Sequence, residues 1–263
     1  MKNTLKISLV EFDMEWENPK ANFNFLDTLI DNHQSDLVLL PEMFSTGFTM
    51  NPAEMAEEVE GESYQWMKSK AIEGNCAVVG SVPTVENGKY YNRMYFVTPD
   101  KTVIYNKKHL FGYGKETEVY SSGENQVSVK YLGWKFRLIV CYDLRFPVWC
   151  RNTNEYDALI CPASWPAVRV EPWKALLKAR AIENLAYTLG INRSGTDGYN
   201  LEYNGNSKVF DPLGEELNLE SKKAFLFKTE ISKDTVQKTR KKYRFLEDQD
   251  GFEIKNSKGD LEF

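Results

Sequence analysis

The chain has 263 residues, of which 42% are hydrophobic and 13% aromatic, so it can fill the core of one large domain or of two small ones. Its formal net charge of −5 disfavours a nucleic acid or an acidic membrane as a general partner. The basic stretch 238–244 is better explained as a solvated end or a subunit contact than as a nucleic-acid site. No apolar run has the length of a membrane span, and residues 1–10 lack the features of a signal peptide, so we expect a cytoplasmic protein without a membrane partner.

The four cysteines and two histidines disfavour the common metal and dithiol motifs. No two cysteines have C-x-x-C spacing, which argues against a zinc ribbon and against a dithiol redox centre. His33 and His109 are too few for a His-rich metal centre. His109 lies two residues from Lys107 and remains a minor alternative as the partner of a cysteine nucleophile, although such a residue more often orients its neighbours. We therefore expect no metal, and reduced thiols at Cys76, Cys141, Cys150 and Cys161.

The first part of the chain predicts strands and helices in alternation. Residues 5–12 alternate apolar and polar side chains, as a strand does, and 37–40 and 76–79 are short apolar strands. Asn18 and Pro19 supply an N-cap and a first helical residue, and apolar side chains then recur at helical spacing. Ser63 is expected to cap a second helix, whose buried stripe would consist of Trp66, Met67 and Ala71.

Hairpins dominate the next part. Asn87-Gly88 predicts a tight turn between strands at 81–85 and 90–97, and Pro99-Asp100 a second turn into a strand at 102–105. Gly133 is expected to turn a third hairpin, between strands at 127–131 and 135–140.

The last part combines one strand, one long helix and a final hairpin. Residues 157–160 predict a strand, and Glu171-Pro172 opens a helix after which Gly190 lies at the helix end or in the next strand. Asp211–Gly214 is expected to turn a hairpin between 206–210 and 224–227. Mixed sheets flanked by helices, with no linker, repeat, G-x-G-x-x-G or Walker loop, favour one layered α/β domain without a nucleotide site.

Polar side chains with complementary chemistry follow three of the predicted strands. Glu42 follows 36–41, Lys107 follows 101–105, and Cys141 follows the apolar run that ends at Val140. Sites gather at the carboxyl ends of strands in layered α/β folds. A cysteine nucleophile, a glutamate base and a stabilising lysine are therefore expected together. An inert core thiol, a surface carboxylate and a solvated lysine are the competing interpretations.

Three segments resemble the signature segments of the nitrilase superfamily, the carbon–nitrogen hydrolases: Leu39–Phe44, Tyr105–Phe111 and Val140–Pro147. The similarity extends over nearly the whole chain, with further matching segments at 163–166, 179–184 and 192–195. Within the superfamily the chain is most similar to the bacterial omega-amidase branch, which hydrolyses 2-oxoglutaramate and related ω-amides of 2-oxo dicarboxylic acids.

The resemblance implies a four-layer α-β-β-α sandwich with mixed sheets, formed by one carbon–nitrogen hydrolase domain over residues 1–263. It also implies that subunits pair into a homodimer. The segment 241–263 is aromatic and charged with little periodicity, and we expect this tail to pack on a partner subunit.

The resemblance also implies a Glu-Lys-Cys triad, which falls on Glu42, Lys107 and Cys141. In this family a second glutamate near the nucleophile usually follows the lysine. Both Glu116 and Glu118 are available, and the spacing to the residues after them favours Glu116.

The expected reaction is hydrolysis of a small primary amide through a thioester, without a metal or an organic cofactor. Cys141 attacks the carbonyl carbon, and Glu42 accepts the thiol proton. The oxyanion is held by Lys107 and the backbone N–H of Tyr142, while Glu116 helps to orient the site.

Recognition of a substrate carboxylate is expected to fall to Arg145, because a guanidinium binds a carboxylate through two parallel hydrogen bonds. A buried structural ion pair with Asp143 or a nearby acid is an equally good interpretation of this arginine, and Asp143 is better explained as a structural residue than as a catalytic one. Trp165 and Phe44 are expected to wall the pocket. Weaker candidates for the carboxylate are Arg169 and Arg193.

Other activities are compatible with the same triad. They are deaminated-glutathione amidase, nitrilase and carbamoyl-amide hydrolase. A catalytically silent scaffold is the alternative from another class, and the presence of all three triad residues argues against it.

Overall fold

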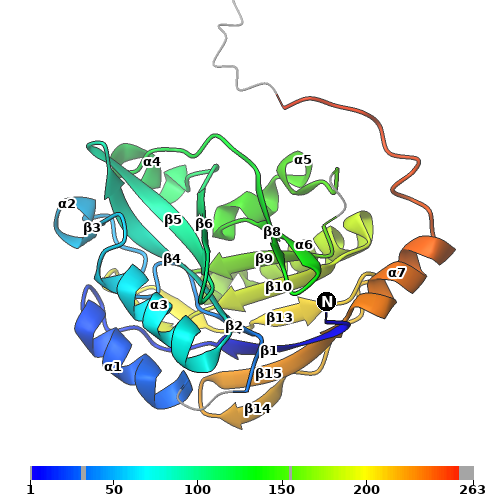
Figure 1. Ribbon diagram of the computed structural model, residues 1–263. Helices are drawn as coiled ribbons and strands as arrows, with labels where there is room; N and C mark the ends of the chain where they lie inside the picture. The colour runs from blue at the N-terminus through cyan, green and yellow to red at the C-terminus, as the bar shows by residue number, and fades with distance from the viewer. Residues whose placement is uncertain (1, 31–33, 154–155, 255–263) are drawn as a thin grey trace, which may run out of the picture.

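Two β-sheets form the centre of the computed structural model, which describes residues 2–30, 34–153 and 156–254 (Figure 1). Within those residues the larger sheet has eight strands, in the order β14 (Glu220–Lys223), β15 (Leu226–Ser232), β1 (Thr4–Val10), β2 (Leu37–Leu39), β4 (Ala77–Glu86), β5 (Lys89–Val97) and β6 (Thr102–Asn106), with β3 (Glu57–Glu58) paired to β4. The sheet is mixed, because β1 runs parallel to β2 and antiparallel to β15.

The second sheet is also mixed. Its strand order is β13 (Lys208–Phe210), β10 (Tyr187–Asn192), β9 (Ala158–Ala163), β8 (Trp134–Leu138) and β7 (Val127–Tyr131). The three central strands are parallel, and the two edge strands are antiparallel to their neighbours. A separate two-stranded hairpin consists of β11 (Ser194–Thr196) and β12 (Glu202–Asn204).

Alternating side chains create the main core between the two sheets. Leu5, Ile7 and Leu9 of β1 lie in the same buried cluster as Phe136 and Leu138 of β8. Because successive strand residues point to opposite faces, the remaining apolar positions of the larger sheet face its other side. Each sheet therefore has a second surface to cover.

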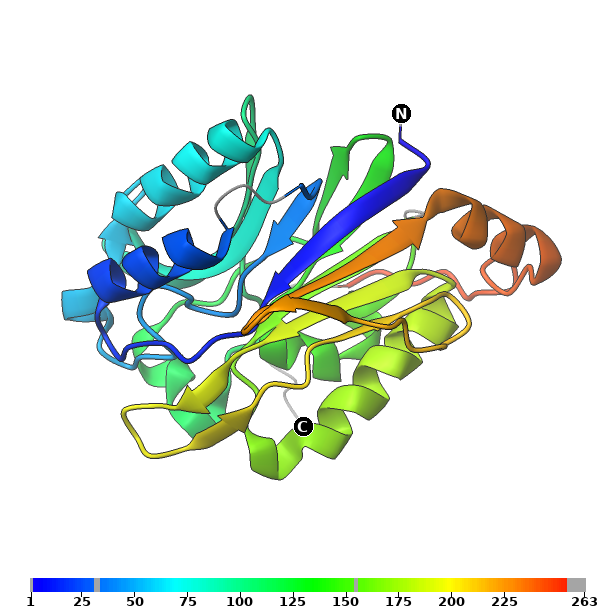
Figure 2. The ribbon, with the colours of Figure 1, turned by 90° about the horizontal axis from the view of Figure 1, so that it is seen from below.

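Helices cover these outer surfaces. Leu26 of α1 (Pro19–Ile30) and Met67 of α3 (Glu62–Gly74) pack with Val38 and Val78 of the larger sheet. On the other side, α6 (Val170–Asn184) contacts β10 and β13. Figure 2 shows α1 and α3 on one flank, the sheets between, and α6 on the opposite flank. The expected four-layer α-β-β-α sandwich is thus confirmed.

The remaining elements lie in the connections between strands or, in the case of α7, after the last strand. They are α2 (Pro52–Met55), α4 (Glu116–Val119), α5 (Pro147–Cys150), α7 (Lys233–Lys242) and three 3₁₀ turns, η1 (Gly112–Gly114), η2 (Cys141–Arg145) and η3 (Ala167–Arg169).

Two of the predicted hairpin turns are confirmed by their backbone angles. Asn87 and Gly88 join β4 to β5 with φ of 52° and 72°, and Leu132 and Gly133 join β7 to β8 with φ of 50° and 89°. A two-residue turn with positive φ at both positions matches the twist of the strands on either side. Gly190 lies inside β10.

Two predictions of local structure were wrong. Ser63 is not a cap but the second residue of α3, after the N-cap Gly61, and its backbone N–H donates to Glu57. The turn at 211–214 reverses the chain so that Phe210 pairs with Glu216, but it does not place 206–210 beside 224–227, because β13 pairs with β10 in one sheet and β15 with β1 in the other. The real hairpin partner of β15 is β14.

The chain leaves the body of the protein after α7. Residues 243–254 run outward from that helix, with Phe245, Phe252 and Ile254 exposed (Figure 1). Residues 255–263 of the predicted tail and His33 lie outside the described part of the chain. No helix between residues 2 and 254, leaving aside 31–33 and 154–155, has the length and apolar character that a membrane crossing requires.

Candidate active site

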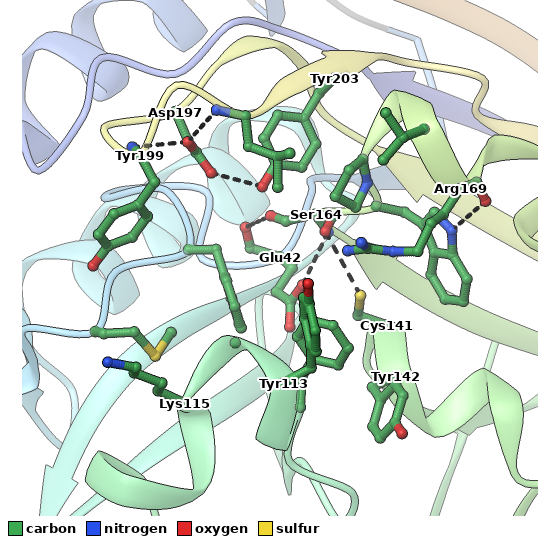
Figure 3. A pocket seen from close by; sticks show the side chains of 18 of the residues that line it. Glu42, Tyr113, Lys115, Cys141, Tyr142, Ser164, Arg169, Asp197, Tyr199 and Tyr203 are labelled. Carbon is green, nitrogen blue, oxygen red and sulfur yellow. Dashed lines mark hydrogen bonds between the residues drawn. The ribbon is translucent and has the colours of Figure 1, made fainter.

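A pocket of about 700 Å³ lies where strands of both sheets end. Glu42 follows β2, Lys107 follows β6 and Cys141 follows β8, and all three line this pocket. The walls come from residues 48–50, the η1–α4 region, η2, the 165–169 segment and the β11–β12 hairpin (Figure 3). The three segments that the sequence singled out therefore meet at one cavity.

A buried cluster of charges lies at the floor of the pocket. Lys107 Nζ donates to Glu42 Oε1 at 2.8 Å and to both carboxylate oxygens of Glu116, at 3.0 and 2.8 Å. All three side chains are buried. Glu118, the alternative second glutamate, is exposed. The single ammonium thus contacts two carboxylates at once.

Three further donors, which the sequence analysis missed, complete the cluster. Asn92 of β5 donates through Nδ2 to Glu42 Oε1 at 2.8 Å and to Glu116 Oε1 at 3.0 Å. The backbone N–H of Ser164 donates to Glu42 Oε2 at 2.9 Å, and that of Phe111 to Glu116 Oε2 at 2.6 Å. An asparagine inside a predicted buried strand was the available signal, since a buried amide needs partners.

Cys141 does not sit directly on a strand end, contrary to the expected 135–140 strand. The strand β8 ends at Leu138, and Cys141 begins the turn η2 with φ of +43°. A non-glycine residue in this region carries strain that its surroundings have to hold. The sulfur is 4.0 Å from the Ser164 carbonyl oxygen, and the residue is 8% exposed. Cys141 is thus largely buried and lines the pocket.

Asp143 holds the cysteine turn and the lysine segment together. Its Oδ2 accepts hydrogen bonds from the Val140 N–H at 3.0 Å and the Tyr105 hydroxyl at 2.6 Å, and its Oδ1 accepts the His109 N–H at 2.8 Å. Tyr105 and His109 flank the pocket lysine, and Val140 precedes the pocket cysteine. The His109 ring also contacts Asp143 Oδ1 at 2.8 Å and stacks on Phe146, so this histidine orients its neighbours and does not line the pocket.

The electrostatics of the floor favour a protonated thiol at rest. Burial, and then the charge of Glu42, raise the pKa of the Cys141 thiol well above its usual value, and Lys107 only partly opposes this. Burial disfavours the charged form of Lys107, but Glu116 and Glu42 outweigh it and raise the pKa of the ammonium. Burial raises the pKa of Glu116, with Lys107 opposing and Glu42 adding to the shift. A nucleophilic thiolate at this position therefore requires a base.

Two arginines face the pocket without a carboxylate partner. Arg145 lies 4.8 Å from the centre of the Trp165 ring, and Arg169 lies 5.4 Å from that of Phe111. Among the residues that the structure describes, neither guanidinium forms an ion pair. The Asp143 oxygens accept hydrogen bonds from Tyr105 and His109 instead. The ion-pair interpretation of Arg145 is therefore wrong, and both cations are available to a ligand.

Two of the expected pocket residues lie elsewhere. Phe44 does not wall the pocket but is buried beneath α1 and α3, with ring centres 6.3 Å from Phe23 and 5.7 Å from Trp66. Arg193 is fully buried and contacts Asp13 at 3.2 Å outside the pocket. Trp165, in contrast, does line the pocket.

The β11–β12 hairpin supplies a wall that the sequence analysis did not anticipate. Asp197 accepts the N–H groups of Tyr199 and Leu201, both at 2.9 Å, and the Tyr203 hydroxyl at 2.8 Å (Figure 3). These bonds fix the loop in one shape. Three side chains at the pocket mouth are largely exposed: Tyr199 at 60%, Tyr113 at 88% and Val168 at 79%.

The other three cysteines, Cys76, Cys150 and Cys161, are buried and do not line the pocket. Burial raises the pKa of Cys76 and of Cys150 to about 12, so neither is poised to react. The described residues contain no group of three or more His, Cys, Asp or Glu side chains suited to hold a metal ion.

The sequence matches the carbon-nitrogen hydrolase family over residues 6–241. It is 40% identical to omega-amidase YafV of Yersinia enterocolitica over 253 residues, which cover 95% of this chain and 98% of that protein. It is 34% identical to 2-oxoglutaramate amidase of Bacillus subtilis over 219 residues, which cover 80% and 84% of the two chains.

A solved structure gives the same result. The protein XC1258 of Xanthomonas campestris, described as a CN-hydrolase superfamily protein with an arsenic adduct in its active site, superposes with a TM-score of 0.93. The two sequences are 35% identical, and the match covers 97% of this chain and 100% of the other. The chain therefore belongs to the carbon–nitrogen hydrolase family, in the omega-amidase branch of the nitrilase superfamily, and is an amidohydrolase that acts on carbon–nitrogen bonds.

Proposed function

We propose that this enzyme hydrolyses the ω-amide of a small 2-oxo dicarboxylic acid, converting 2-oxoglutaramate to 2-oxoglutarate and ammonia. The observation that carries the proposal is one pocket with a thiol, a glutamate and a lysine at its floor and two guanidiniums on its walls that form no ion pair with any described residue. The names of the relatives support the same substrate class.

In the first step Cys141 attacks the amide carbonyl carbon while Glu42 takes the thiol proton. The Lys107 ammonium and the Tyr142 backbone N–H hold the oxyanion. Collapse breaks the carbon–nitrogen bond, Glu42 returns the proton to the leaving nitrogen, and ammonia departs from a Cys141 thioester. The raised pKa of the buried thiol supports this role for a base.

In the second step water hydrolyses the thioester. Glu42 takes a proton from the water, whose oxygen attacks the acyl carbon, and then returns it to the sulfur. The 2-oxo acid leaves and the free thiol is restored. Glu116 assists by holding the Lys107 ammonium in place through two contacts.

Substrate recognition is assigned to the guanidinium groups. Arg145 binds the substrate carboxylate, and Arg169 adds a second cation on the same side of the pocket. A bidentate guanidinium–carboxylate pair is strong and directional. Stacking on Trp165 and Phe111 favours a fixed position for each group, and no protein carboxylate among the described residues competes with the substrate.

A kinetic comparison tests this proposal. Ammonia release is followed with 2-oxoglutaramate, glutamine, deaminated glutathione and a simple nitrile, with Cys141→Ala as the control. The highest kcat/KM is expected for 2-oxoglutaramate. A higher kcat/KM for deaminated glutathione or for the nitrile would overturn the substrate assignment, and ammonia release by Cys141→Ala would overturn the nucleophile.

We also propose that one domain extends over the chain, that the protein is a cytoplasmic homodimer, and that the tail 241–263 packs on the partner subunit. The exposed Phe245, Phe252 and Ile254 support the role of the tail, because an apolar stretch that leaves its own body needs another surface. Cys141, Cys150 and Cys161 form no disulfide among the described residues, which supports a reducing compartment. A truncation that ends near Lys241 should lose the dimer in size-exclusion chromatography, and an unchanged dimer would contradict the proposal.

A further inference from the structure

We propose that Asn92 is a positioning residue that keeps the carboxylates of Glu42 and Glu116 ionised side by side, so that Glu42 can serve as the base for Cys141. This inference rests on the proposed function only in giving Cys141 a base. Asn92 is fully buried in β5. Its Nδ2 bridges the two carboxylates at 2.8 and 3.0 Å, and its backbone oxygen accepts the Lys107 N–H at 3.0 Å.

When both glutamates are ionised, the floor of the pocket carries an excess of negative charge. Two carboxylates face one ammonium, and the other titratable groups that face them are Cys141 from η2 and Tyr120 from the residue after α4. Two carboxylates that share a buried site tend to bind a proton between them, because desolvation and like-charge repulsion both disfavour the doubly ionised state. Hydrogen-bond donors reverse that preference.

Besides the Lys107 ammonium, the Asn92 amide donates to both carboxylates at once. The Ser164 N–H reaches Glu42 and the Phe111 N–H reaches Glu116, so each of these backbone donors serves one carboxylate. The orientation of the amide is also defined. Turning it over would place Asn92 Oδ1, which has no partner among the described residues, against two carboxylate oxygens.

Removal of the amide donors should therefore let one proton bind to the glutamate pair. A protonated Glu42 cannot accept the thiol proton. In a variant that lacks the amide, the acid limb of the pH profile of Cys141 reactivity should consequently move to higher pH, while the alkaline limb stays at the same pH. A purely structural asparagine would lower the rate at every pH alike.

The rate of alkylation of Cys141 by iodoacetamide, measured from acid to alkaline pH, tests the inference. The variants are Asn92→Leu, with similar volume and no donors, and Asn92→Ala in case the leucine variant does not fold. Cys141→Ala gives the background from other thiols. Asn22→Leu is the matched control, because Asn22 is a buried asparagine that donates to backbone oxygens of Glu15 and Ser45 away from the pocket.

We expect the acid limb of the Asn92 variants to move up by about one to two pH units, since hydrogen bonds to charged groups contribute about that much. The limb of Asn22→Leu should coincide with that of the wild type. An unshifted limb, or a uniform loss at all pH values, would overturn the role of Asn92. Alkylation needs no amide substrate, so a shifted limb in an enzyme inactive on 2-oxoglutaramate would contradict the proposed substrate alone.

Discussion

The floor and the mouth of the pocket are built in opposite ways. At the floor, Glu42, Lys107, Glu116 and Asn92 are buried and form hydrogen bonds with one another. At the mouth, aromatic and apolar side chains are largely exposed, and two arginines on the walls have no carboxylate partner within the described residues.

This difference separates the residues that carry out the reaction from the residues that select the substrate. A buried, preorganised floor stabilises charge without reorganisation and should act on the amide group whatever molecule carries it. The side chains of the mouth and walls, including the two arginines, should decide which substrate binds. Floor substitutions should therefore lower kcat for every substrate, and wall substitutions should raise KM for anionic substrates only.

The largest effect is expected at the nucleophile. Cys141→Ala should lower kcat by about 10⁴-fold or more on charged and uncharged amides alike, because loss of a nucleophile abolishes the covalent route. Ammonia release with both kinds of amide measures it. Retention of activity on either kind would break the division between floor and mouth.

The next largest effect is expected at the oxyanion donor. Lys107→Met removes a charged donor and leaves two buried carboxylates without their cation, so kcat should fall by about 10²–10³-fold. Circular dichroism and the melting temperature should be measured in parallel. A folded Lys107→Met protein with unchanged kcat would remove the lysine from the mechanism.

A smaller and selective effect is expected on the wall. Arg145→Gln and Arg169→Gln should each lower kcat/KM for 2-oxoglutaramate by about tenfold to a hundredfold, the worth of a charge-assisted hydrogen bond. Lys115→Gln removes a cation from the same pocket without a guanidinium and is the matched control. Equal losses on an uncharged amide would assign the arginines to folding or to chemistry, not to selection.

The smallest effect is expected at the rim. Tyr199→Ala should change kcat on a small amide by no more than about twofold, since exposed side chains contribute little to stability and this one lies far from the reacting atoms in Figure 3. Steady-state kinetics on 2-oxoglutaramate measures it. A large loss would mean that the mouth takes part in closing the site over the substrate.

The same division explains what the sequence could predict. Glu42, Lys107 and Cys141 were found because polar residues that follow apolar strands stand out, although β2 and β6 belong to one sheet and β8 to the other. Asn92 was missed because it lies within a strand. A buried polar residue there indicates that a hydrogen-bond partner exists, but not which residue it is. The Asp197 loop was missed because its bonds are local to a hairpin with no distinctive pattern.

The errors have a common physical cause. Phe44 follows Glu42 by two residues, but the chain turns there, and its ring meets helices α1 and α3 that no local pattern reveals. The turn at 211–214 was located correctly, yet a turn does not specify which sheet receives the next strand. Local signals give elements and their ends, whereas tertiary packing decides which face each side chain meets.

The most direct measurement of the central claim is the mass of Cys141 during turnover. The enzyme is quenched with acid while it hydrolyses 2-oxoglutaramate, digested, and examined by peptide mass spectrometry. We predict that the Cys141 peptide carries the acyl group of the substrate, and that Cys76, Cys150 and Cys161 remain unmodified. Rapid ammonia release with an unmodified Cys141, or with an adduct on another cysteine, would contradict the account.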